Sequence, residues 1–324
     1  MNAWYQQQLF AITVQLETSS LVFVIRSLRE SDVEKMKADK TSRTAQYMAL
    51  FRALESKRNN SDRLFFDPFA IHFLDPGLKL AVKASNIHLF KSYLEKRIQK
   101  RIPGAYSSGV ARTKYIDDLL AFTIKDGINQ LVILGAGFDT RASRLKFLKS
   151  IPVIEIDHPN TAKFKIDTYK KQLGELPKNV TYCQIDFNKQ SLENLALKYN
   201  FDFTKPTTII WEGVTNYLTA EAIDSTFAFI SKYSKDSYVI FTYVDKQILD
   251  NPRAFFGGEK LLEDLEKIEE RWTFGFYPYE LSKYLATFGL TLVEDLGATE
   301  YRQKYLPEGT EKGYEFYRVA MAKK

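Results

Sequence analysis

Hydrophobic residues in the first third of the chain are spaced as in amphipathic helices. Within residues 33–58, apolar side chains such as Ala45 and Met48 recur at steps of three and four, so they fall on one helical face. Two further helices are expected at 85–101, where basic residues are frequent, and at 112–126. The pattern therefore predicts a helical region at this end of the chain.

Two Asp-Pro pairs punctuate this helical region. Asp67 is expected to cap a helix beginning at Pro68, because an aspartate accepts hydrogen bonds from first-turn amides and proline suits the first turn. The sequence Asp75-Pro76-Gly77 is expected to break that helix.

From residue 130 onward the pattern changes to short, continuous apolar runs. They occupy residues 130–134, 152–156, 180–185, 207–211 and 237–244. Segments suited to helices lie between them, at 139–149, 159–173, 189–198 and 219–234. This alternation predicts a parallel sheet with helices on both faces, and continuous runs suit strands that are covered on both sides. We expect an α/β fold with a doubly wound, mostly parallel, Rossmann-like sheet.

The C-terminal part of the chain is expected to complete this sheet. Residues 245–277 form an irregular, charged insertion, interpreted as a lid, and a helix follows at 278–288. Two strand candidates, 290–294 and 315–322, bring the sheet to seven strands, and the second is expected to pair antiparallel at or near an edge. Two domains are expected: an N-terminal arm and helical cap over 1–126, and an α/β domain over 127–324.

Candidate binding residues stand where the predicted strands end, which is where open α/β sheets bind ligands. Gly135 and Gly137 follow the first strand and allow a ligand close to the backbone. The next three predicted strands end at Asp157, Asp186 and Glu212. The carboxylate of Asp157, at the end of the second strand, can accept hydrogen bonds from the hydroxyls of a ribose. Each has an ordinary structural alternative. The glycines could form only a tight turn, Asp157 and Asp186 could cap the following helices, and Glu212 could be a solvated loop carboxylate. Together they favour a nucleoside cofactor.

The glycine turn does not suit a dinucleotide. The third glycine of the G-x-G-x-x-G fingerprint is missing after Gly137, and Asp139 would repel a pyrophosphate at the following helix N-terminus. An NAD(P)-dependent oxidoreductase is therefore disfavoured, and a P-loop is absent from the sequence. S-adenosylmethionine suits the turn better, because it has no phosphate and carries a sulfonium and an ammonium group.

Composition excludes several other classes. The chain has 324 residues with 46 Lys and Arg against 40 Asp and Glu, a net charge of +6, which is too small to indicate nucleic-acid binding by itself. The 45% hydrophobic content is that of a globular protein. Because Cys183 is the only cysteine of the sequence, an intrachain disulfide is impossible. With only three histidines besides, a structural metal centre is not expected.

The most apolar N-terminal stretch, residues 9–25, does not fit a targeting or membrane segment. Gln15 and Glu17 interrupt it, and no basic segment precedes it. A cytoplasmic protein without a membrane partner is expected, which agrees with the single cysteine.

Several longer motifs lie in the helical region and at the same strand ends. They are TAQYMALFRALE (44–55), DPFA (67–70), ARTKYIDDLL (111–120), LVILGAGFDTRASRL (131–145), IEIDHP (154–159) and WEGVTNYL (211–218). Together they closely resemble the leucine carboxyl methyltransferase family, and particularly its bacterial branch of polyketide-type O-methyltransferases. The resemblance covers about residues 40–245.

This resemblance implies a class I methyltransferase fold and S-adenosyl-L-methionine-dependent methyl transfer to oxygen. Arg112 would pair with the methionine carboxylate, and Glu212 would lie near the methionine amino group or the acceptor. The implied cofactor-binding residues are Arg112, Gly135, Ala136, Gly137, Asp157, Asp186, Phe187 and Glu212. Glu212 and Tyr217 are the candidate catalytic residues, and Arg52 and Thr44 are candidates near the cofactor carboxylate or the acceptor.

A small-molecule carboxylate or hydroxyl is the expected acceptor, without a nucleic-acid partner. A carboxylate is already ionised at neutral pH and needs no general base, whereas a phenol or an alcohol needs one. Methylation of a protein C-terminus, or a non-catalytic cofactor- or RNA-binding role, are the alternatives.

The positive charge is concentrated in one segment. Residues 78–114 contain six lysines, three arginines and one glutamate, a net charge of +8, so the rest of the chain sums to −2. The ordinary interpretation is a solvated helix face. The alternative is a field that attracts anionic acceptors to the mouth of the site.

Overall fold

The structure, a computed structural model, describes residues 43–86, 88–185 and 190–324. The first ten residues of the helix predicted at 33–58 lie outside this part, as do the candidate site residues Asp186 and Phe187.

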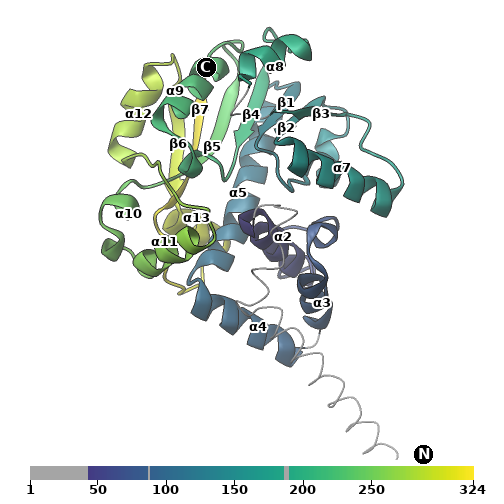
Figure 1. Cartoon of the computed structure of the whole chain (residues 1–324), viewed down its shortest axis with the longest axis vertical. Helices are drawn as coiled ribbons and strands as arrows, with labels where there is room; N and C mark the ends of the chain where they lie inside the picture. Colours follow the sequence, from purple (N-terminus) through teal and green to yellow (C-terminus); the bar gives the residue numbers. More distant parts are fainter. Residues whose placement is uncertain (1–42, 87, 186–189) are drawn as a thin grey trace, which may run out of the picture.

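Seven strands of the described chain form one sheet in the order β3-β2-β1-β4-β5-β7-β6 (Figure 1). The strands β1 to β5 run parallel, and β7 pairs antiparallel with both β5 and β6. Their bounds are β1 (Gln130–Leu134), β2 (Val153–Asp157), β3 (Val180–Gln184), β4 (Thr207–Trp211), β5 (Tyr238–Val244), β6 (Thr291–Gly297) and β7 (Tyr317–Lys323). The doubly wound, mostly parallel sheet is confirmed, with β7 one place inside the edge. The chain order reverses between β1 and β4, where ligands bind in such sheets.

Helices cover both faces of the sheet. They are α8 (Leu192–Lys198), α9 (Ala220–Ile230) and α12 (Pro278–Ala286) on one face, and α5 (Ala105–Lys125) and α13 (Ala298–Tyr305) on the other. Val132 of β1 packs into the first core and Ile133 into the second, which explains why this strand is apolar throughout. A further helix, α7 (Pro159–Leu173), contacts β2 and β3.

The cap lies at one end of the sheet (Figure 1). It consists of α2 (Arg43–Glu55), the 3₁₀ turn η2 (Ala70–Phe73), α3 (Pro76–Ala84) and α4 (His88–Arg101). Phe73 stacks on Phe138 of the loop after β1, with ring centroids 5.2 Å apart, so the cap is packed onto the carboxyl end of the sheet.

The two Asp-Pro pairs differ from expectation. Asp67 accepts hydrogen bonds from the amides of Phe69 and Ala70, but no helix begins at Pro68: only the four-residue η2 follows, from Ala70 with Phe69 as its N-cap. Asp75, expected to break a helix, begins α3 instead, because its Oδ1 accepts from the Leu78 amide at 2.8 Å.

The insertion over residues 245–277 is helical rather than irregular, which is a second correction. It contains α10 (Gln247–Asp250), the 3₁₀ turn η5 (Pro252–Ala254) and α11 (Gly258–Lys267). Apolar residues spaced along α11, among them Leu261 and Leu265, pack with Trp272 and Phe316 into a small core of their own. Figure 1 shows α10 and α11 at the same end of the sheet as the cap.

Two other helix predictions were wrong in extent, and a third helix was missed. α5 begins at Ala105 rather than 112, because its first turns carry small residues that pack by tertiary contact and show no apolar period. The helix expected at 139–149 is split into α6 (Arg141–Arg144) and the 3₁₀ turn η3 (Lys146–Leu148) by the extended Leu145. α13 was not expected at all. Within the described ranges, no helix combines the length and the apolar composition needed to cross a membrane.

Candidate functional site

The glycine loop after β1 has a backbone that only glycine adopts easily. Gly135 has a φ of +64° and Gly137 a φ of +46°. A Cβ on Gly135 would lie 2.4 Å from Cγ2 of Val214, in the loop after β4. The loop is fixed from the other side as well, because the buried Ala136 donates its amide to the Ile156 carbonyl at 3.1 Å.

Asp157 closes this loop and does not cap the next helix. Its carboxylate accepts hydrogen bonds from the amides of Gly137 and His158. The cap of α7 is His158, whose Nδ1 accepts from the Asn160 amide at 3.3 Å. Burial raises the pKa of Asp157 despite these bonds. The half-buried carboxylate at the end of β2 therefore lies against the glycine loop.

Glu212, at the end of β4, is held by two arginines. Arg112 donates from Nε to Oε1 at 3.0 Å, and Arg141 donates from Nη1 to Oε2 at 2.9 Å. Burial opposes ionisation of Glu212, but Arg141 and Arg112 outweigh it and lower the pKa. Its side chain is only 18% exposed, so the alternative of a solvated loop carboxylate is wrong.

This ion pair belongs to a larger buried network. Arg141 also contacts Asp139 and donates from Nε to Asp117 at 2.8 Å, and Arg144 binds the same Asp117 through two nitrogens. Three arginines and three carboxylates are therefore linked in one network, in which Arg141 contacts all three carboxylates. The network brings together α5, α6 and the end of β4, and it fixes the direction in which Arg112 and Glu212 point.

Arg52 joins the cap to the same loop. Its Nε donates to Asp67 at 2.9 Å and its Nη2 to the Phe138 carbonyl at 2.6 Å. Thr140 donates to the same carboxylate of Asp67 at 2.7 Å. Arg52 therefore anchors the cap on the glycine loop.

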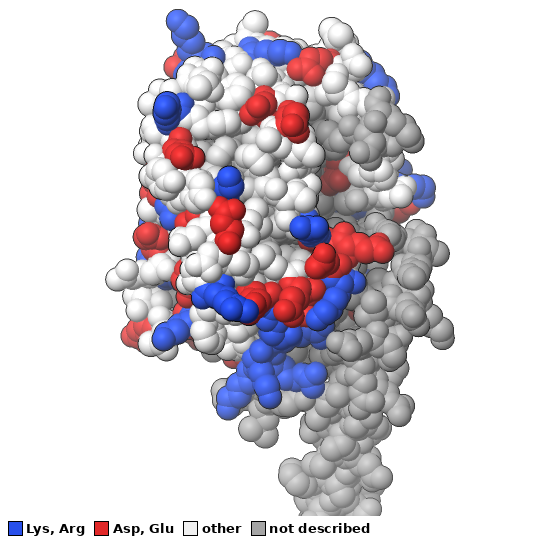
Figure 2. Space-filling model, turned by 60° about the vertical axis from the view of Figure 1, so that its left-hand side comes forward, with Lys and Arg blue, Asp and Glu red and all other residues white. Residues whose placement is uncertain are grey.

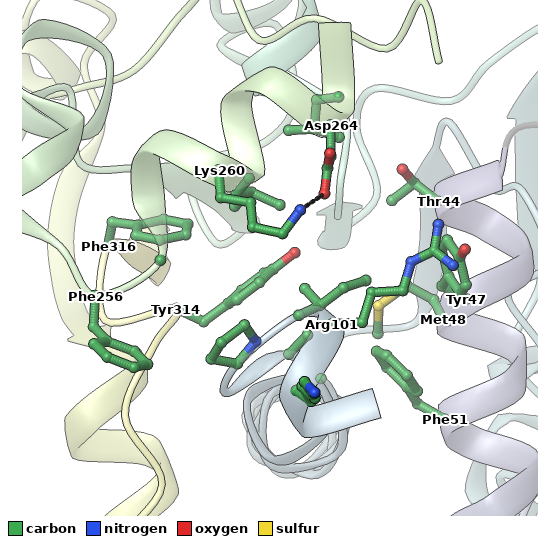
Figure 3. Close-up of a pocket in the computed structure, with 18 of the residues that line it drawn as sticks. Thr44, Tyr47, Met48, Phe51, Arg101, Phe256, Lys260, Asp264, Tyr314 and Phe316 are labelled. Carbon is green, nitrogen blue, oxygen red and sulfur yellow. Dashed lines mark hydrogen bonds and ion pairs between the residues drawn. The ribbon is translucent and has the colours of Figure 1, made fainter. Parts of the chain in front are cut away.

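A cavity of about 160 Å³ lies beside Arg112, between α2, the start of α5 and α11 (Figure 3). Apolar and aromatic side chains form most of its wall, among them Met48, Phe51, Leu261, Tyr314 and Phe316. Charged side chains at the cavity are Lys100, Arg101, Arg112, Lys260 and Asp264. Because Arg112 lines the cavity and also binds Glu212, the cavity reaches the carboxyl end of the sheet.

Thr44 and Tyr217 meet at the edge of this cavity. Thr44 donates to Glu270 of the lid segment, and the Tyr217 hydroxyl donates to the Thr44 hydroxyl at 3.2 Å. Burial raises the pKa of Tyr217 to about 12. The cap, the lid and the loop after β4 are thus joined at one point.

The surface around α4 is positively charged. Figure 2 shows Lys and Arg side chains gathered at the end of the molecule where α4 lies in Figure 1, beside a band of Asp and Glu. α4 carries Lys96, Arg97, Lys100 and Arg101, and the last two line the cavity.

Sequence reasoning did not identify Tyr314 or Lys260. Neither lies in a motif or at a strand end, and only the glycine before Tyr314 marks the turn that presents it. Among the described residues, no group of three or more His, Cys, Asp or Glu side chains is arranged to hold a metal ion.

A model of the leucine carboxyl methyltransferase family matches residues 45–231 of the chain. The chain belongs to the leucine carboxyl methyltransferase family.

Curated proteins are similar to this chain over part of their length. A protein of Mycobacterium marinum is 30% identical over 200 residues, which are 61% of this chain and 62% of that protein. One from Streptomyces coelicolor is 33% identical over 196 residues, 59% of this chain and 64% of that protein. Both are provisionally named S-adenosyl-L-methionine-dependent methyltransferases. The chain thus covers less than two thirds of these relatives.

Solved structures show the same fold at low identity. A provisionally named methyltransferase of Thermobifida fusca aligns with a TM-score of 0.56 at 15% identity, covering 87% of this chain and 97% of that one. A DUF574 family protein of Streptomyces avermitilis also aligns with a TM-score of 0.56, at 13% identity, and the alignment covers 88% of this chain and 98% of that protein. Sheet and helices therefore follow the methyltransferase fold expected of this family.

Proposed function

We propose that this protein is an S-adenosyl-L-methionine-dependent O-methyltransferase that methylates a carboxylate of a small molecule. Family membership and the names of the relatives support the methyltransferase activity. The geometry at the ends of β1, β2 and β4 supports the choice of cofactor, and the protonation states of Glu212 and Tyr217 support the choice of acceptor.

The residues at the strand ends fit S-adenosyl-L-methionine. In this proposal Arg112 holds the methionine carboxylate, Glu212 lies near the amino group, and Asp157 binds the ribose. In the same proposal, the turn from Gly135 to Gly137 runs beneath the methionine part. The proposed adenine contacts, Asp186 and Phe187, lie outside the described residues.

The charge of the glycine loop also suits a ligand without phosphate. Asp139 follows the loop, and Arg141 lowers its pKa to about 2 against the opposing effect of burial. An ionised carboxylate at this position repels a pyrophosphate. The same carboxylate is compatible with a cofactor that carries a sulfonium cation.

The observation that carries the choice of a carboxylate acceptor is that neither candidate catalytic residue is suited to remove a proton. Glu212 is bound by two arginines and has a lowered pKa, so it is a weak base. Tyr217 has a pKa of about 12 and is a protonated phenol at neutral pH. A carboxylate acceptor is already ionised and needs no base, whereas a phenol or an alcohol does.

When bound, S-adenosyl-L-methionine would supply a methyl group: a bond forms between the acceptor's oxygen and the methyl carbon, the bond from that carbon to sulfur breaks with its electron pair remaining on sulfur, and the products are a neutral methyl ester and S-adenosylhomocysteine. The protein's part is to position the two reactants and to exclude water. Arg52 holds the cap on the glycine loop, and the contact between Thr44 and Glu270 joins the cap to the insertion; in this proposal both contacts serve this exclusion.

Two measurements test the proposal. Isothermal titration should show S-adenosyl-L-methionine binding to the purified protein, and failure to bind would refute the cofactor assignment. Transfer of a labelled methyl group should then be followed in a cell extract. Mild base releases volatile methanol from methyl esters and leaves methyl ethers intact, so base-stable label would overturn the carboxylate assignment.

The alternatives are separated by the same extract. Label in the small-molecule fraction supports the proposal, whereas label in protein supports methylation of a protein C-terminus. An RNA-binding role, suggested only by the basic residues near α4, would show binding that weakens steeply as salt rises.

A further inference from the structure

Tyr314 has an unusual backbone conformation at the wall of the cavity. Its φ is +65°, in the left-handed region that a bulky side chain rarely adopts. The preceding Gly313 has a φ of +103°. Such conformations persist where the surrounding packing imposes them, and they are enriched at binding sites.

The packing that imposes this turn is a contact between two backbone segments. A Cβ on Gly104 would lie 2.2 Å from the Gly313 carbonyl oxygen, and a Cβ on Gly313 would lie 2.2 Å from the Pro103 carbonyl oxygen. The Gly313 amide also donates to the Glu315 carboxylate at 2.6 Å. The junction between α4 and α5 therefore fixes the point from which the Tyr314 ring enters the cavity.

The ring of Tyr314 is well packed, but its hydroxyl is not paired. The ring lies 5.2 Å from that of Phe316 and contacts the apolar clusters of both the cap and the lid. In Figure 3 the hydroxyl points into the cavity, on the side where Lys260 lies. Among the described residues, none makes a hydrogen bond to it. The hydroxyl can therefore donate a hydrogen bond to a molecule that enters the cavity.

The cavity is built for an apolar molecule with one negative charge. Its wall is mainly apolar, and Phe256 at its rim is 58% exposed. Of the charged side chains that line it, Lys260 is paired with Asp264 at 2.9 Å and Arg112 with Glu212 at 3.0 Å. Lys100 and Arg101 make the net charge of the lining positive, which favours an anionic group over a cationic one.

We propose that Tyr314 determines acceptor specificity, and that the acceptor is a hydrophobic monocarboxylic acid. The Tyr314 hydroxyl donates a hydrogen bond to the acceptor's carboxylate, and the walls formed by Met48, Phe51 and Leu261 enclose its alkyl or aryl body. This inference rests on the proposed function, because it places the acceptor of that reaction.

The experiment uses acetate, hexanoate and decanoate as probes. Each is titrated calorimetrically into the full-length protein in the presence of S-adenosylhomocysteine. Affinity should rise about fourfold per methylene until the cavity is filled. Tyr314→Phe keeps the ring and removes the hydroxyl, so it should weaken decanoate binding about tenfold or more while leaving S-adenosylhomocysteine affinity unchanged.

Two further variants complete the design. Tyr305→Phe is the matched control, because its hydroxyl bonds to Asp118 on the far side of α5, and decanoate binding should be unchanged. Gly109→Ala places a Cβ 2.9 Å from Cε of Met48, which should push that side chain into the cavity and favour shorter acids. Alanine suits a helix better than glycine, so this variant should fold.

The outcomes separate the inference from the proposed function. Equal binding of acetate and decanoate overturns the inference, as does wild-type affinity of Tyr314→Phe for decanoate. Binding of S-adenosylhomocysteine without binding of any alkanoate also overturns the inference but leaves the cofactor assignment standing. Failure to bind S-adenosylhomocysteine overturns the proposed function itself.

Discussion

Arg112 and Glu212 are 100 residues apart in the sequence, yet Nε of Arg112 lies 3.0 Å from Oε1 of Glu212. Arg141 occupies the other oxygen of the same carboxylate. A fixed negative charge therefore lies between two fixed positive charges at the carboxyl end of β4. This arrangement suits a zwitterionic ligand, because its ammonium and carboxylate groups meet charges of opposite sign.

Replacing Arg112 with lysine should weaken cofactor binding. Arg112→Lys keeps the positive charge but loses the fork of donors that binds a carboxylate with two nitrogens, so the dissociation constant for S-adenosyl-L-methionine should rise roughly tenfold or more. Titration calorimetry measures it. Arg253→Lys, an exposed arginine of the lid paired with Glu259, should bind normally. Equal affinities in the two variants would contradict the role given to Arg112.

A side chain at Gly135 should disrupt the glycine loop for two separable reasons. Gly135→Ala introduces a Cβ at a φ of +64° and 2.4 Å from Val214. We expect a loss of about 1–3 kcal/mol in unfolding free energy, together with weaker cofactor binding. The double variant with Val214→Ala removes the clash but keeps the unfavourable φ, so it should recover stability only partly. Full recovery in a denaturant titration would mean that the backbone conformation is not strained.

The buried pair of Glu155 and Lys165 should make stability fall as pH rises. The Lys165 side chain is 2% exposed and the Glu155 side chain 4% exposed, and Nζ of Lys165 lies 2.6 Å from Oε2 of Glu155. Burial raises the pKa of Glu155 to about 7. This value is above the ordinary 4.5, so the folded chain binds the proton more tightly than the unfolded chain between these pH values. The stabilisation from this group is fully present below about pH 4.5 and is lost as the pH rises through 7. The expected loss in unfolding free energy is on the order of 3 kcal/mol.

Denaturant titrations at several pH values test this expectation. Glu155→Gln should flatten the slope of stability against pH, whereas Glu308→Gln, an exposed residue, should keep it. Glu155→Gln also removes the charge that Glu155 carries above about pH 7 next to the buried Lys165, which changes stability in that range for a separate reason, so the slope below pH 7 is the readout. A slope unchanged from the wild type would refute the raised pKa.

Reversing the charge of α4 should affect the acceptor and not the cofactor. Changing Lys96, Arg97, Lys100 and Arg101 to glutamate should raise the KM for a carboxylate acceptor such as decanoate roughly tenfold at low salt, because an attractive field becomes repulsive. The effect should shrink at high salt, and cofactor affinity should stay constant. Lys235→Glu, in the loop before β5, is the control. An unchanged KM would leave α4 as an ordinary solvated face.

Parts of the fold could be predicted because burial leaves a local pattern. β1, β4 and β5 are covered on both faces and therefore appear as continuous apolar runs. α13 and the lid helix α11 were missed, since charged residues dominate their sequences and their apolar contacts are made with distant parts of the chain.

The sequence by itself determined the alternation of strands and helices that builds the parallel part of the sheet, the family, and the positions of the glycine loop, Asp157 and Glu212, because each depends on neighbouring residues or on a contiguous motif. Only the tertiary structure decided that Glu212 is shared by Arg112 and Arg141, and that Tyr314 points into a cavity beside them. These relationships join α5, α6, the end of β4 and the turn before β7. Such contacts form when the sheet and its cap pack together, and no local spacing records them.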